Sequence, residues 1–95
     1  MDVARKQKRV VYVGGIGSDA TEAELQEAFV PFGPIEAISI EKQKDGDVSG
    51  GMAGHAFVQF QEMTDAVAAI DNMNENLFKG DRVLTCNLAH AASTM

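Results

Sequence analysis

The chain has few of the residues on which several classes of protein depend. Its single cysteine, Cys86, excludes an internal disulfide and fits a reducing compartment. Cysteine and histidine pairs at metal-binding spacing are missing, so we expect neither a zinc site nor a cofactor. The longest strongly apolar run is only Val10 to Val13, so we expect no membrane-spanning segment, no membrane partner and no signal peptide.

The residues of an enzyme active site are also scarce. Two histidines and one cysteine that is predicted to be buried make no pair of nucleophile and base. The glycine pair Gly14-Gly15 is not followed by a phosphate-binding pattern, so we interpret it as a chain reversal. The sequence therefore predicts that the chain is not an enzyme.

Basic residues are few: 8 against 14 acidic residues, with a net charge of −6 and a pI near 4.7. Taken alone, this balance argues against a nucleic-acid partner. Half of the basic residues, however, lie just before the first predicted strand: Arg5, Lys6, Lys8 and Arg9. The acidic residues gather around two predicted helices, so a sheet face turned away from those helices stays nearly neutral. A ligand on that face is held mainly by contacts other than charge, which predicts weak to moderate affinity.

The hydrophobic pattern predicts six elements in the order β-α-β-β-α-β. Strands are expected at about 9–14, 38–40, 54–60 and 83–88, and helices at about 21–32 and 64–73. Thr21 and Glu24 form a capping box that fixes the start of the first helix. This order predicts an α+β, ferredoxin-like fold, with a four-stranded antiparallel sheet and both helices on one face. The first and third strands should then lie side by side in the centre of the sheet.

The third strand alternates strictly between two kinds of residue. Ala56, Val58 and Phe60 suit a core, whereas His55, Phe57 and Gln59 face the opposite side. In the first strand Tyr12 faces the same open side as Phe57. Two uncovered rings on adjacent strands would form a platform on which nucleobases stack.

The inward-facing residues of the remaining elements follow from the same periodicities. In the second helix the pattern predicts a buried stripe of Met63, Ala66, Val67, Ile70 and Met73. In the last strand Leu84 and Cys86 should point inward, and Thr85 and Asn87 outward.

The 95 residues are enough for one small domain, which we expect to be a monomer. Residues 1–8 show no periodicity and are predicted to be a flexible basic arm. Residues 9–89 are predicted to form the folded domain, and residues 90–95 a disordered tail. The glycine-rich segment 42–53 is predicted to be a long loop between two antiparallel strands.

Two segments resemble the signature motifs of the RNA recognition motif (RRM) family. The six residues Val11 to Ile16 resemble the motif on the family's first strand, and Ala53 to Phe60 the eight-residue motif on its third strand. Segments 11–15, 31–33 and 69–75 further resemble one subgroup, the N-terminal RRM of cyclophilin E-type nuclear peptidyl-prolyl isomerases. This resemblance implies a nuclear location and a role in RNA processing. The cyclophilin domain of that subgroup is not among these residues, so the resemblance does not extend to its isomerase activity.

The family resemblance also implies a binding site for single-stranded RNA. Tyr12 and Phe57 match the two base-stacking positions, and His55 the third aromatic position, whose ring packs against sugars. The remaining implied contacts are Gln59, Asn87 and the backbone near Ala89 toward base edges, and Lys42 toward phosphate. Ala53 replaces a basic residue that pairs with phosphate in the family, so one contact is lost.

Two questions stay open on the sequence alone. His55 is either a polar replacement tolerated at an open site or a stacking imidazole that gains positive charge in mild acid. The second question is whether the fold serves RNA at all, because the acidic balance, Ala53 and His55 also suit a protein-interaction module. Such a module would use the sheet or the acidic helix face, with nuclear RNA-processing or chromatin proteins as its partners.

Overall fold

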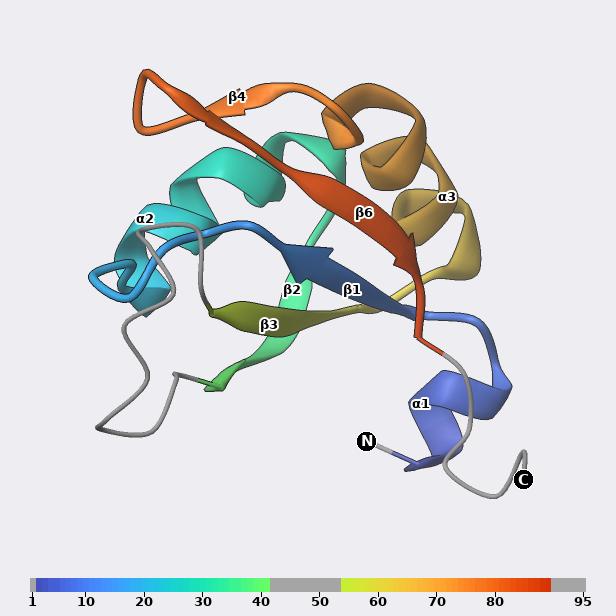
Figure 1. The fold of residues 1–95 in the computed structure, drawn as a ribbon. Helices are drawn as coiled ribbons and strands as arrows, with labels where there is room; N and C mark the ends of the chain where they lie inside the picture. Colours follow the sequence, from blue (N-terminus) through green and yellow to red (C-terminus); the bar gives the residue numbers. More distant parts are fainter. Residues whose placement is uncertain (1, 42–53, 90–95) are drawn as a thin grey trace.

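The sheet has four antiparallel strands, as the sequence predicts. In the computed structural model, which describes residues 2–41 and 54–89, the strand order is β2-β3-β1-β6. The central strands are β1 (Val10–Gly14) and β3 (His55–Phe60), and the outer strands are β2 (Ile35–Glu41) and β6 (Thr85–Leu88). Figure 1 shows α2 (Glu22–Phe29) and α3 (Met63–Met73) together on one side of this sheet. The ferredoxin-like α+β fold is therefore confirmed.

The core lies between the sheet and these two helices. Every second residue of β1 and β3 points into it, because side chains alternate along a strand. Leu25 and Phe29 from α2, and Ala66 and Ala69 from α3, close it from the other side. Among the described residues no helix is long and apolar enough to span a bilayer.

The buried face of α3 differs from the predicted stripe. Met63 and Val67 are 46% and 41% exposed, whereas Ala69 is fully buried. Ala66 and Ala69 lie three positions apart and so share one face of the helix. Their small side chains let α3 approach the sheet, which turns the larger Val67 toward solvent. The prediction that Met63 and Val67 are buried is wrong.

The start of α2 is fixed by the predicted capping box. The backbone N–H of Glu24 donates to Thr21 Oγ1 at 3.2 Å, and the N–H of Thr21 donates to Glu24 Oε1 at 3.0 Å. A short 3₁₀ turn, η1 (Val30–Phe32), continues the helix and ends at Gly33. These contacts hold α2 at the position from which Leu25 and Phe29 reach the core.

A small hairpin joins α3 to the last strand. It pairs β4 (Leu77–Phe78) with β5 (Arg82–Val83), so the last strand of the main sheet begins at Thr85 rather than Val83. Arg82 ties the hairpin to the loop before α2, because its guanidinium donates to Asp19 Oδ1 at 2.6 Å and to Ile16 O at 2.8 Å. Lys79 forms a further ion pair with Glu24 Oε2 at 3.0 Å.

This ion cluster predicts a loss of stability in acid. The hydrogen bond from Arg82 holds the pKa of Asp19 at about 2, below its ordinary value of 3.8. A carboxyl with a lowered pKa stabilises the folded state above its unfolded pKa, and that contribution is lost as the pH falls toward 2. We expect Asp19→Asn to lower the urea midpoint at pH 7. The difference between this variant and the wild type should shrink as the pH falls from about 4 to 2. A difference that is constant over this range would contradict the assignment.

The first residues form a helix, α1 (Asp2–Lys6), rather than the predicted flexible arm. The N–H of Arg9 donates to Ala4 O at 2.9 Å, and Lys8 adopts a left-handed φ of 62° that turns the chain into β1. Ala4 is only 3% exposed, and it packs with Val10 and Ala89 on the open side of the sheet. The prediction fails here because Val10, on the same side as Tyr12, needs an apolar cover that periodicity cannot reveal. The predicted loop 42–53 and tail 90–95 lie outside the described residues.

Candidate nucleic-acid interface

Three rings meet on the side of the sheet that α2 and α3 leave open. Tyr12 lies directly opposite Phe57 in the β1–β3 register, and their ring centroids are 5.8 Å apart at an interplanar angle of 60°. His55 lies 5.4 Å from the Tyr12 ring and 5.6 Å from the Phe57 ring. The predicted juxtaposition of Tyr12 and Phe57 on the open face is therefore present, and all three rings are partly exposed.

Gly14 makes room for the ring of Tyr12. A Cβ at this position would lie 2.9 Å from Tyr12 Oη and 3.2 Å from a ring carbon. Such contacts are too close for a side chain, so the absence of one lets the tyrosine ring lie along β1 toward His55. The glycine at this position thus contributes to the platform as well as to the chain reversal.

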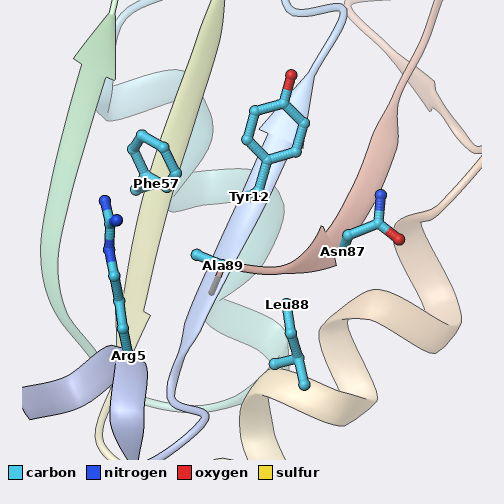
Figure 2. Close-up of a pocket in the computed structure, with 6 residues that line it drawn as sticks. All are labelled: Arg5, Tyr12, Phe57, Asn87, Leu88 and Ala89. Carbon is cyan, nitrogen blue, oxygen red and sulfur yellow. The ribbon is translucent and has the colours of Figure 1, made fainter. Parts of the chain in front are cut away.

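A hollow of about 460 Å³ opens beside Tyr12, which is within the usual range for small-molecule sites. Its lining comes from four parts of the chain: Arg5, Tyr12, Phe57, and the run Asn87, Leu88 and Ala89. Figure 2 shows that Arg5 extends from α1 toward Phe57. Asn87 lies on the opposite side of the hollow, and Ala89 and Leu88 lie between Arg5 and Asn87. The hollow therefore has two rings, a cation and an amide around an apolar floor.

Arg5 lies over the ring of Phe57, a contact that the sequence analysis did not predict. Its guanidinium carbon is 4.6 Å from the ring centroid, a distance typical of a cation–π contact. The expectation of two uncovered rings is thus wrong for Phe57, because the guanidinium of Arg5 from α1 covers part of its ring. Tyr12 and Phe57 both border the hollow.

The predicted base-edge contact of Gln59 is already engaged within the protein. Its Nε2 donates to Glu36 Oε1 at 2.7 Å, and Arg9 Nη1 donates to the same oxygen at 2.9 Å. These two hydrogen bonds, that of Gln59 foremost, lower the pKa of Glu36. The bond to Glu36 uses one of the two N–H donors of the Gln59 amide and fixes the orientation of that amide. The sequence did not single out Glu36 or Arg9 for this role.

The other predicted site residues fall in different places. Asn87 is exposed and borders the hollow, as expected. Ala89 lines it as well, but its backbone N–H already donates to Val10 O at 2.9 Å, so only its carbonyl could face a ligand. Lys42 lies outside the described residues.

The opposite side of the sheet offers no comparable chemistry. Cys86 is buried there, and burial raises the pKa of its thiol to about 12, which makes it a weak nucleophile. Over residues 2–41 and 54–89, histidine, cysteine and acidic side chains nowhere gather in a group able to hold a metal ion. The functional chemistry of the described chain is therefore concentrated on the open face.

The architecture defines a sheet platform of the α+β class that presents aromatic rings to solvent. The sequence profile of the RNA recognition motif family matches residues 11–84. The chain belongs to this family, whose members are RNA-binding modules and not enzymes. An uncharacterized RNA-binding protein of Schizosaccharomyces pombe is 37% identical over 90 residues, which cover 92% of this chain and 73% of that protein.

Solved structures show the same fold. The RRM of Rna15 with bound RNA (GU) is 28% identical, with a TM-score of 0.68 over 85% of this chain and 82% of that one. The RRM3 domain of Mip6 is 20% identical, with a TM-score of 0.76 over 87% of this chain and 94% of that one. At that identity the second comparison speaks for the fold alone.

Proposed function

We propose that the chain binds single-stranded RNA on the open face of its sheet, by stacking a base on Tyr12. The observation that carries this proposal is the hollow beside Tyr12, whose lining combines aromatic rings with the polar side chains of Arg5 and Asn87. Membership in a family of RNA-binding modules supports it, as does the similarity to a structure that contains bound RNA.

The affinity is expected to be weak to moderate. Arg9 is paired with Glu36, and Glu41 lies opposite His55 on the same face, so acidic groups offset the basic residues near the rings. Stacking then supplies most of the binding energy, and stacked bases typically contribute about 1–3 kcal/mol each.

The proposal is tested by titrating isotope-labelled protein with a pool of short RNA oligonucleotides. We expect chemical-shift changes to be concentrated at Tyr12, His55, Phe57 and Asn87. Silence at these residues would reject the proposal. Silence there together with partner-induced shifts on α2 would favour the alternative of a protein-interaction module.

Salt dependence provides a further prediction about the mechanism. If two or three phosphates are engaged, log K should fall by only about 1.4–2 for each tenfold rise in salt concentration. Fluorescence anisotropy with one labelled oligonucleotide at several salt concentrations measures this slope. A slope several times steeper would mean that charge, rather than stacking, drives binding.

The cellular setting follows only from the resemblance to the cyclophilin E-type subgroup. We therefore propose a nuclear location and a role in RNA processing as the natural setting for this RNA-binding module. Segments 11–15, 31–33 and 69–75 support this subgroup assignment. Imaging of a fluorescently tagged full-length protein would test the location, and a purely cytoplasmic signal would reject it.

A further inference from the structure

The helix α1 is held against the open face of the sheet by few side chains. Ala4 is only 3% exposed, and it packs into the small apolar cluster on that face. Arg5 is half-buried and extends toward Phe57 (Figure 2), with its guanidinium carbon 4.6 Å from the centre of the ring. The other side chains of residues 3–8 are exposed. Within this segment, docking therefore depends on Ala4 and Arg5.

A helix with so few contacts is only marginally stable. Five residues do not hold a helical conformation without tertiary support. The backbone N–H groups of Gln7, Lys8 and Arg9 donate to carbonyls of α1, at 3.0, 3.0 and 2.9 Å respectively. Short terminal elements of this kind open locally at a lower free energy than the core of a domain. The helix can therefore leave the sheet while β1 and β3 stay folded.

The docked helix takes a place that RNA also needs. A base that stacks on Phe57 must lie flat against the face of its ring. The guanidinium of Arg5 covers part of that ring, and a base cannot occupy the same area at the same time. Tyr12 borders the hollow too, and the ring contacts that it makes are with His55 and Phe57. While α1 is docked, a base therefore finds Tyr12 open and Phe57 partly covered.

We propose that α1 competes with RNA for the ring of Phe57: the docked helix limits the platform to one base, stacked on Tyr12, and release of the helix opens a second stacking position. This inference rests on the proposed RNA binding and deepens it. The covering segment lies outside residues 11–84, the part of the chain that the family profile matches. The affinity of a site that is open in only a fraction of the molecules is lowered by that fraction. The wild-type chain therefore binds RNA more weakly than the same platform with its helix released.

The first test releases α1 without a change of charge. Ala4→Gln places a large polar side chain at a position that is 3% exposed, so the helix should undock. Binding of heptaadenylate, measured by fluorescence anisotropy, should become about three- to tenfold tighter. The matched control is Val3→Gln, which should leave the affinity unchanged because Val3 is 66% exposed on the same helix. Binding by Ala4→Gln that is equal to or weaker than that of the wild type would overturn the proposal.

The second test removes only the covering side chain, so it holds even if Ala4→Gln destabilises the domain. Arg5→Ala uncovers the Phe57 ring but also removes a positive charge, and these changes act on RNA affinity in opposite directions. We expect the uncovered ring to outweigh the lost charge, and heptaadenylate to bind at least about twofold more tightly. Lys6→Ala removes the same charge from an exposed position of α1 and should bind slightly more weakly. Weaker binding by both variants would mean that only charge matters, which contradicts the competition.

A combination of variants locates the gain at Phe57. Phe57→Ala should cost the wild type less than about threefold in affinity, because its ring is partly covered. Once Ala4→Gln has released the helix, the same replacement should cost more than about fivefold. Equal costs in the two backgrounds would reject competition at this ring.

Hydrogen exchange tests the displacement of the helix directly. When the wild-type chain is saturated with heptaadenylate, the N–H groups of Gln7, Lys8 and Arg9 should exchange faster with solvent, because their acceptors lie in α1. Unchanged or slower exchange would mean that α1 stays docked in the complex, and the proposal would fail.

Tyr12→Ala separates this proposal from the proposed function. If Tyr12→Ala binds heptaadenylate as well as the wild type, RNA does not stack on the sheet and both proposals fail. If Tyr12→Ala loses binding while Ala4→Gln and Arg5→Ala bind as the wild type does, the proposed function stands and only the competition by α1 is rejected.

Discussion

Replacing Tyr12 by alanine is expected to weaken RNA binding by about 5- to 150-fold, corresponding to the ~1–3 kcal/mol of a stacked base. The effect should be large because Tyr12 borders the hollow, whereas part of the Phe57 ring lies under the guanidinium of Arg5. Adding Phe57→Ala removes the support of Arg5 as well, and the double variant should show no measurable binding. Fluorescence anisotropy with a labelled oligonucleotide measures both losses.

Two variants control for loss of the fold and for loss of apolar surface in general. Tyr12→Phe keeps the ring and should bind within about threefold of the wild type, since stacking requires only the π-face. Leu77→Ala removes a side chain that is 58% exposed on the β4–β5 hairpin, away from the rings, and should leave RNA binding unchanged. Normal binding by Tyr12→Ala would place the RNA elsewhere on the molecule.

Replacing Phe29 by alanine is expected to cost ~3–5 kcal/mol of folding free energy, the usual loss for a phenylalanine in a core. Phe29 is completely buried on α2, and its ring contacts Phe32 edge-on at a centroid distance of 6.5 Å. A domain of this size typically has only ~5–15 kcal/mol of stability, so the variant should unfold at much lower urea concentration. Equilibrium urea denaturation followed by circular dichroism measures the change.

The matched comparison is Val67→Ala on α3. Val67 is 41% exposed, so its truncation should change the free energy of unfolding by no more than about 0.5 kcal/mol. A loss close to that of Phe29→Ala would show that α3 is rotated to bury Val67, as the helical pattern predicted. The pair of variants therefore tests the orientation of the helix as well as the core.

The sequence predicted the sheet well because alternation in β1 and β3 carries two signals at once. Val11 and Val13 mark the buried face of the sheet, which leaves Tyr12 on the open face. In β3 the same alternation places Phe60 on the buried face and Phe57 on the open face. The element order then allowed few ways to connect the strands, so the adjacency of the two rings followed. This part of the candidate site could be derived without coordinates.

The helix face of α3 was harder to predict from its pattern. Alanine is compatible with both a buried and an exposed position, so Ala66 and Ala69 give a weak signal compared with the bulky Met63 and Val67. Which face of α3 is buried depends on how closely the helix packs against the sheet, and that distance depends on the side chains of both surfaces. The residue pattern of one helix therefore does not determine its buried face.

The helix α1 was missed for two physical reasons. With five residues it is too short to show a helical period, and helices of that length form only where tertiary contacts support them. The turn that folds it back depends on Lys8 at a φ of 62°. This left-handed conformation is usually marked in a sequence by glycine, and here the residue is a lysine. The contact between Arg5 and Phe57 follows from that turn and could not be predicted from either residue alone.

The limits of the family match bear on how this domain is handled in the laboratory. The profile spans residues 11–84, yet Arg5, Asn87, Leu88 and Ala89, four of the six residues around the hollow, lie beyond it. A chain trimmed to those limits would lose α1, Val10 at the start of β1, and the whole of β6. Affinities measured on such a shortened domain would report a different surface, so expression boundaries should run from the first residue to beyond Ala89.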